Sequence, residues 1–184
     1  MNGIAVLISG RGSNLQAILE SPAGEHVSAV LSDNPEAAGL RIAEEYGKDA
    51  FIIAPEDFAS PQEWEEKLRE ALDAIAPKII ALAGFMRILS PAFAREYAGR
   101  AVNIHPSLLP QFPGLETHAR ALAAGAQEHG CTAHYVAAKV DGGEIIARRK
   151  IAVQPEDNAK TLAARVLAKE HEMYPQVLLE LLNK

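Results

Sequence analysis

The chain has 184 residues, of which 48% are hydrophobic and 23% are charged, and its formal net charge is −6. This composition is ordinary for a globular protein, and the length fits a single domain, predicted to span residues 1–184. The net negative charge disfavours nucleic acid as a partner, but it leaves room for a local site that binds one phosphate.

The start of the chain and its cysteine content predict a cytoplasmic location. The start lacks the basic region and the small-residue cleavage site of a signal peptide. No apolar run approaches the ~20 residues that span a bilayer, so no membrane partner is expected. The single cysteine, Cys131, excludes an internal disulfide, suits a reducing compartment and is interpreted as a strand residue.

An apolar run from Ile4 to Ser9 is followed directly by GRGSNLQAIL. This pattern predicts a buried strand, a tight glycine turn and a helix capped by Ser13 or Asn14. Free N–H groups and the helix dipole at such a turn favour an anion. An ordinary capped helix explains the turn about equally well, and a lone Gly-x-Gly is weak evidence for a dinucleotide.

Strands and helices alternate through the first half of the chain. The pattern predicts strands at 27–32, 50–54 and 78–83 and helices at 36–46, 60–76 and 90–98. Ser60, Pro61 and Glu63 form a helix-start signature, and Ser90 with Pro91 forms a second one. The alternation implies a doubly wound, mostly parallel α/β sheet of the Rossmann-like kind.

Two features of this half are open to more than one interpretation. Asp33 either contacts a ribose, as in a dinucleotide fold, or opens a turn with the residues that follow it. The side chains of Met86 and Ile88 are most simply interpreted as core or as the lead into a helix. Both the glycine turn and residues 86–89 follow strands, and ligands of such sheets bind beyond the carboxyl ends of the strands.

The sequence NIHPSLLPQFPG spans Asn103 to Gly114. Asn103 and His105 are two residues apart at a strand end, so their side chains point to the same face. Pro106 biases His105 towards extended geometry. If the pair stood alone, two side chains that cap local turns would explain it. The glycine turn and residues 86–89 are expected at the same edge of the sheet, however, and a rigid amide–imidazole pair beside them indicates catalysis.

The remainder of the chain predicts, in order, a helix at 116–124, strands at 130–139 and 144–153, and a helix from about 157 to 182. Asp141 lies in the Gly-Gly turn between the two strands, which indicates an antiparallel pair added to the parallel sheet. Thr132 and His134 share one face of the first strand and point either into a pocket or to solvent. His118 is interpreted as a structural histidine.

The Asn103–Gly114 segment resembles the signature of the folate-dependent formyltransferases, and PQFPGLETH resembles the glycinamide ribonucleotide transformylases among them. The resemblance extends from about Ile4 to Pro175. The six histidines and the single cysteine show no His-Glu-x-x-His or paired-cysteine spacing, so no metal is expected. The resemblance implies transfer of a formyl group from 10-formyltetrahydrofolate to the amine of glycinamide ribonucleotide, in purine biosynthesis. It also implies two small-molecule partners and a monomer or homodimer. A phosphate-binding half, about 1–100, would precede a folate-binding and catalytic half, about 101–184.

The resemblance assigns roles to individual residues. The catalytic residues would be Asn103, His105 and Asp141, with the amide and a protonated imidazole stabilising an oxyanion and the carboxylate favouring the charged ring. The substrate phosphate would lie against Gly12, Ser13, Asn14 and Glu170. The folate would contact Met86, Arg87, Ile88, Leu89, Asn103, Ala137, Ala138, Lys139, Val140 and Asp141.

Two positions depart from the family pattern, and two other functions remain open. Leu167 stands where a glutamine is expected near the phosphate, and Pro61 stands where a basic residue would hold the glutamate tail of the folate. A hydrolase that deformylates the same folate would use the same three catalytic residues, although it has no need of a phosphate site. A non-catalytic nucleotide-binding module would use the glycine turn alone.

Overall fold

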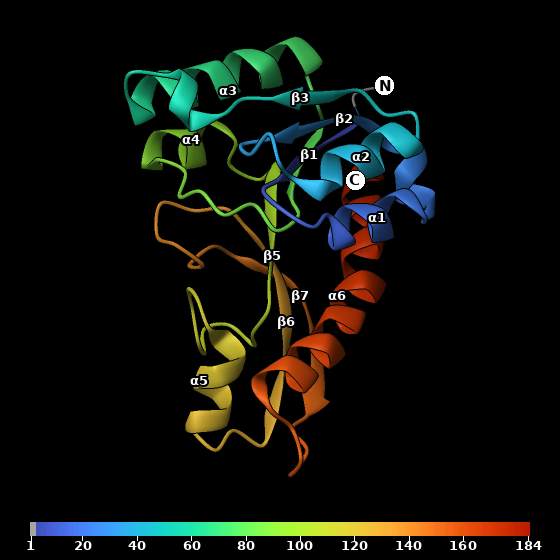
Figure 1. Ribbon diagram of the computed structural model, residues 1–184, viewed down its shortest axis with the longest axis vertical. Coiled ribbons are helices and arrows are strands. Elements are labelled where there is room, and N and C mark those ends of the chain that lie inside the picture. Colours follow the sequence, from blue (N-terminus) through green and yellow to red (C-terminus); the bar gives the residue numbers. More distant parts are fainter. Residues whose placement is uncertain (1–2) are drawn as a thin grey trace.

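The computed structural model describes residues 3–184, which form a seven-stranded sheet with helices on both faces (Figure 1). The strands are β1 Ile4–Ile8, β2 Val27–Ser32, β3 Ala50–Ile52, β4 Ile79–Leu82, β5 Ala101–His105, β6 Glu128–Tyr135 and β7 Ile145–Ala152. Their order is β3-β2-β1-β4-β5-β6-β7, and β6 pairs antiparallel with both of its neighbours. The predicted fold class is confirmed.

The helices are α1 Ser13–Leu19, α2 Ala38–Glu45, α3 Pro61–Ile75, α4 Pro91–Glu96, α5 Thr117–Ala123 and α6 Ala159–Leu182, with short 3-10 turns at Pro22–His26 and Pro55–Asp57. Ser60 caps α3 as predicted, because its Oγ accepts a hydrogen bond from the Glu63 N–H at 3.2 Å. No helix within residues 3–184 is long and apolar enough to cross a membrane.

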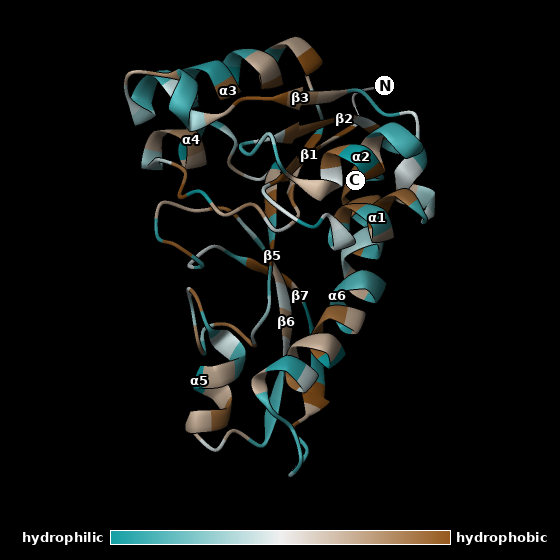
Figure 2. Cartoon of the chain, in the orientation of Figure 1, coloured by the Kyte–Doolittle hydropathy of each residue, from teal (hydrophilic) through white to brown (hydrophobic). Residues whose placement is uncertain are grey.

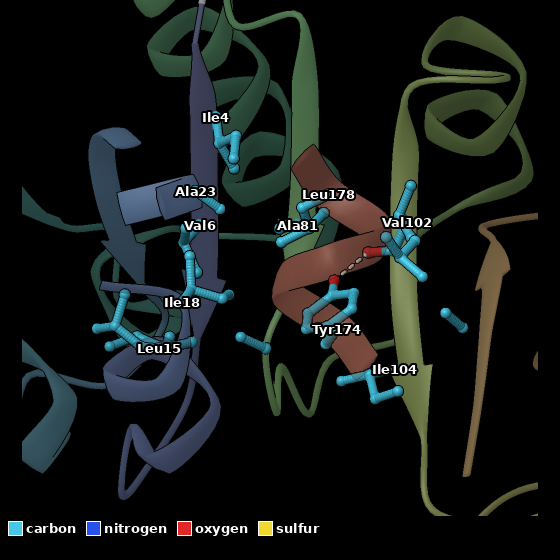
Figure 3. Close-up of a cluster of buried hydrophobic side chains, with 14 of the residues drawn as sticks. Ile4, Val6, Leu15, Ile18, Ala23, Ala81, Val102, Ile104, Tyr174 and Leu178 are labelled. Atoms are coloured by element: carbon cyan, nitrogen blue, oxygen red, sulfur yellow. Dashed lines mark hydrogen bonds between the residues drawn. The ribbon is translucent and has the colours of Figure 1, made fainter. Parts of the chain in front are cut away.

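Two hydrophobic clusters fill the two faces of the sheet. Alternate residues of β1 point to opposite faces, so Ile4 and Val6 pack with α1 and α6 whereas Leu7 packs with α3 and α4. Figure 3 shows the first cluster, with Tyr174 of α6 between β4 and β5. The helices alternate hydrophobic and hydrophilic bands in Figure 2, as expected for helices that cover a sheet.

The connection between β6 and β7 differs from the predicted short turn. β6 ends at Tyr135 and not at residue 139, so residues 136–144 form a longer loop, called here the hairpin loop. The pairing with β7 shifts register between Ala133 and His134, and the Val136 N–H then donates to the carbonyl of Ala101 in β5. The chain therefore continues along β5 and separates from β7. The alternation of residues in a strand does not indicate which neighbouring strand it will follow, so the sequence did not predict this separation.

Candidate active site

The carboxyl ends of β4 and β5, the end of β6 and the hairpin loop surround a cavity of about 430 Å³. The predicted site residues that line it are Asn103, His105, Asp141, Met86, Arg87, Ile88, Leu89, Ala137, Ala138 and Val140. Lys139 is exposed and is not part of the lining. The cavity thus lies at the carboxyl ends of central strands, where ligands of doubly wound sheets bind.

The Asn103 amide is held by His134, which faces the cavity. The Nδ1 of His134 lies 2.9 Å from the Tyr135 carbonyl, and its Nε2 lies 3.2 Å from Nδ2 of Asn103. Burial lowers the pKa of His134, so the ring is neutral, donates from Nδ1 and accepts from the amide at Nε2. The sequence left the direction of His134 open, and its contact with Asn103 was missed.

Both ring nitrogens of the buried His105 face acceptors. Nδ1 lies 3.4 Å from Oδ2 of Asp141, and Nε2 lies 3.1 Å from the carbonyl oxygen of Phe112. This arrangement suits an imidazolium, which donates from both nitrogens. Oδ2 of Asp141 also accepts from the Gly114 N–H at 2.8 Å, so this carboxylate joins the hairpin loop to the segment after β5.

Two further histidines contact each other beside the cavity, whereas Cys131 packs in the hydrophobic cluster under α6. His118 lines the cavity, and its Nδ1 lies 3.2 Å from Nε2 of the buried His129. Burial lowers the pKa of both rings, that of His129 to about 4. Cys131 is buried in β6, and burial raises the pKa of its thiol to about 12, which fits the predicted strand residue and not a reactive thiol.

The predicted phosphate residues lie at the start of α1. Nδ2 of Asn14 donates to Oε2 of Glu170 at 2.7 Å, which joins α1 to α6. Burial raises the pKa of Glu170, and the Asn14 hydrogen bond partly opposes this effect. The predicted cap by Ser13 or Asn14 is wrong: Gly12 is the N-cap residue and no side chain caps α1. The N–H groups of the first turn are therefore left without a side-chain acceptor.

Gly12 also has a packing role. Its φ of 77° is left-handed, and a Cβ there would lie 2.5 Å from the Cα of Gly39 in α2. Ser13 lines a second, polar cavity of about 340 Å³ with residues of α1 and with His171. Leu167 is half-buried on the same side of α6 as Glu170.

The segment 83–90 between β4 and α4 contains residues that are predicted to contact the folate donor, and it is called here the donor loop for that reason. It forms one wall of the 430 Å³ cavity. Met86 and Ile88 are 67% and 78% exposed, so their interpretation as core side chains is wrong. Within residues 86–89, Leu89 is the buried residue. The apolar side chains stand at the rim because the loop passes over the carboxyl end of the sheet and not beneath a helix.

The Asp33 side chain contacts the donor loop and does not open the turn after β2. Its Oδ2 lies 2.8 Å from Nε of Arg87 in the donor loop. The turn after β2 is opened by Asn34 instead, whose Oδ1 accepts from the Glu36 N–H at 2.9 Å. Asp33 and Arg87 are 54 positions apart, and only the folded sheet brings them together.

Comparison with known proteins places this site in a family. A formyl transferase family model matches residues 2–178. The phosphoribosylglycinamide formyltransferase of Escherichia coli (strain K12) is 44% identical over 179 residues, which cover 95% of this chain and 84% of that protein. The trifunctional purine biosynthetic protein adenosine-3 of Drosophila melanogaster is 44% identical over 186 residues, and the match spans 14% of its length.

Solved structures agree with this placement. The phosphoribosylglycinamide formyltransferase of Coxiella burnetii, solved in complex with CHES, superposes with a TM-score of 0.92 at 46% identity, covering 96% of this chain and 85% of that one. The enzyme from Brucella melitensis superposes with a TM-score of 0.90 at 47% identity, covering 97% of this chain and 94% of that one. The chain therefore belongs to the formyl transferase family, among the phosphoribosylglycinamide formyltransferases.

Proposed function

We propose that this chain transfers a formyl group from 10-formyltetrahydrofolate to the amine of glycinamide ribonucleotide, a step of de novo purine biosynthesis. Its family membership supports the reaction. One observation supports the site: the Asn103 amide, the His105 imidazole and the Asp141 carboxylate line one cavity. A chain of contacts joins them, from Asn103 to His134 at 3.2 Å, from His134 to Asp141 at 3.7 Å and from Asp141 to His105 at 3.4 Å. These are the groups that stabilise an oxyanion and move a proton.

In this proposal the amine attacks the formyl carbon directly, and no nucleophilic side chain takes part. Asn103 gives one N–H to His134, which leaves its second N–H free to donate to the developing oxyanion. Protonated His105 supplies a second donor when it exchanges the Phe112 carbonyl for that oxyanion. A preorganised donor of this kind is typically worth about 3 kcal/mol in the transition state.

Asp141 stabilises the charged form of His105 and assists the transfer of the proton from the attacking amine to the leaving nitrogen through a water. Its carboxylate lies between the two histidine rings, with Oδ2 3.4 Å from His105 and Oδ1 3.7 Å from His134. Because burial keeps His134 neutral, the carboxylate acts on His105.

The two substrates are proposed to meet at this cavity. The folate would lie along the donor loop and the hairpin loop, whose exposed Met86, Ile88 and Val140 offer apolar surface. The phosphate of glycinamide ribonucleotide would lie at the start of α1, with Glu170 beside it. Proline at position 61 cannot make the charged contact expected with the glutamate tail of the folate. Leucine at position 167 likewise cannot make the polar contact expected near the phosphate of glycinamide ribonucleotide.

The remaining proposals concern the setting of the enzyme. The single buried Cys131 suits a reducing compartment, and we propose the cytoplasm. Both partners would be small molecules, and the chain would work as a monomer or homodimer. The division into a phosphate-binding half up to about residue 100 and a catalytic half after it stays a prediction.

The test is an absorbance assay of the formyl donor with and without glycinamide ribonucleotide. We expect little loss of donor when it is alone and fast conversion once the amine is added. The reason is that a phosphate site at the start of α1 would serve glycinamide ribonucleotide, whereas hydrolysis by water needs no phosphate site. Equal rates in the two cuvettes would assign the chain to the deformylating hydrolase. No conversion in either, with intact binding of the nucleotide, would support the non-catalytic module.

A further inference from the structure

The donor loop has no regular secondary structure, so contacts from other elements fix its course. Oγ of Ser9, which follows β1, accepts from the Met86 N–H at 2.8 Å. The Phe85 ring stacks on Trp64 of α3, with the ring centroids 6.3 Å apart. Trp64 is the only tryptophan in the chain, so its fluorescence reports on the start of this loop.

Asp33 holds the middle of the donor loop. Its side chain is 4% exposed, whereas that of its partner Arg87 is 50% exposed at the cavity rim. Oδ1 of Asp33 has no hydrogen-bond partner among residues 3–184. A buried carboxylate with one oxygen unsatisfied is unfavourable for folding, and a neutral residue would fill the position at less cost. Arg87, its one polar partner in the described part of the chain, belongs to the donor loop.

Glu65 of α3 holds the end of the same loop. Its Oε2 accepts from the Ser90 N–H at 2.7 Å, and its Oε1 accepts from the Ser90 hydroxyl at 2.5 Å. Arg69 pairs with the same carboxylate at 2.8 Å. The Glu65 side chain is 9% exposed, and it fixes the residue at which the donor loop becomes α4.

We propose that the buried carboxylates Asp33 and Glu65 are positioning residues for the formyl donor. They touch no substrate, but they hold Arg87 and Ser90, so that the backbone of the donor loop is ordered before the folate arrives. An ordered loop loses less conformational entropy on binding, and this raises the affinity for the donor. The inference rests on the proposed binding of the folate at this loop.

The variants Asp33→Asn and Glu65→Gln keep the shape of each side chain and remove its charge. The matched control is Asp73→Asn, an exposed carboxylate of α3 that contacts Tyr97 and not the donor loop. For each protein we would measure kcat, the KM for both substrates, the tryptophan emission, and the calorimetric Kd of a stable dideazafolate. We expect the donor KM and the Kd to rise about tenfold in both variants, as for the loss of one charge-assisted hydrogen bond.

The KM for glycinamide ribonucleotide and kcat should stay within about twofold of the parent values, the Trp64 emission should shift, and the control should match the parent. A carboxylate whose variant leaves the donor KM unchanged has no positioning role. A variant in which both KM values rise and kcat falls would show general damage to the fold and would also overturn the inference. A parent protein that transfers formyl but binds no dideazafolate would instead overturn the proposed folate site.

Discussion

Among the proposed catalytic residues, Asp141 is the one whose identity is most easily explained without catalysis. Its φ of 53° lies in the left-handed region, where aspartate is enriched, so a role in the turn alone would account for it. Asp141→Asn separates the two explanations, since asparagine tolerates the same backbone conformation and can still accept from the Gly114 N–H. The variant removes the charge that faces His105. We expect turnover to fall by roughly 10²–10⁴-fold, the usual contribution of acid–base assistance.

The measurement is kcat at pH 7 to 8, together with thermal melting and the affinity for glycinamide ribonucleotide, which should both stay near the parent values. A variant that keeps its turnover within about threefold would reduce Asp141 to a turn residue.

Glu170 leads to a prediction about pH. Burial raises its pKa above the usual 4.5 of a glutamate, so the protonated carboxyl favours the folded state below pH 4.5. This advantage is lost as the pH rises through the folded pKa. Glu170→Gln removes the charge and keeps an acceptor for Asn14. The variant should therefore melt roughly 2–5 °C higher than the parent at pH 7.5 and should bind glycinamide ribonucleotide more weakly.

Melting curves between pH 4.5 and 8 test whether the Glu170→Gln variant is the more stable protein and how the difference depends on pH. The difference between variant and parent should shrink as the pH falls and the parent carboxyl becomes protonated. A difference that is constant over this range, or a less stable variant at pH 7.5, would contradict it.

At the scale of elements, one hydroxyl of α6 contacts two strands of the sheet. The Tyr174 hydroxyl lies 3.1 Å from the Leu82 carbonyl and 2.8 Å from the Val102 carbonyl, so it bridges β4 and β5. Figure 3 shows its contact with Val102. Tyr174→Phe leaves both buried carbonyls without this donor. We expect the free energy of unfolding in urea to fall by about 1–3 kcal/mol.

Tyr46→Phe is the matched control, because its hydroxyl contacts Glu20 at the exposed surface. This variant should lie within about 0.5 kcal/mol of the parent. Equal unfolding free energies for the Tyr174 variant and the control would mean that the Tyr174 hydroxyl does not stabilise the contact of α6 with β4 and β5.

The whole molecule should be sensitive to acid because of its buried histidines. Burial lowers the pKa of His129 to about 4, and the pKa values of His134 and His118 are lowered for the same reason. A depressed pKa means that the unfolded chain binds protons first. The stability that these rings contribute is present above pH 6.5 and is lost as the pH falls towards 4.

His129→Gln should flatten the decline of the melting temperature between pH 6.5 and 4, whatever its effect at pH 7.5. The exposed His26 provides the control, and His26→Gln should leave the shape of the curve unchanged. A His129 variant whose curve runs parallel to that of the parent would show that other groups cause the acid sensitivity.

Local patterns were enough to predict most of the fold. The Ser60 cap, the apolar run of β1 and the alternation of strands and helices each depend on residues within a few positions of one another. The errors arose where tertiary contacts decide: β6 leaves β7 at Tyr135 because it continues along β5, and Met86 is exposed because no helix covers the donor loop.

The sequence by itself determined the parallel sheet, the order of its elements, and the presence of Asn103 and His105 side by side at a strand end. It could not determine that His134 holds the Asn103 amide, that Asn14 meets Glu170 across 156 positions, or that Asp33 holds Arg87 across 54. Propensity, capping and the two-residue period of a strand act over one or two turns of chain. Contacts between distant side chains exist only after the sheet has brought the carboxyl ends of its strands to one edge, so the tertiary structure alone decided them.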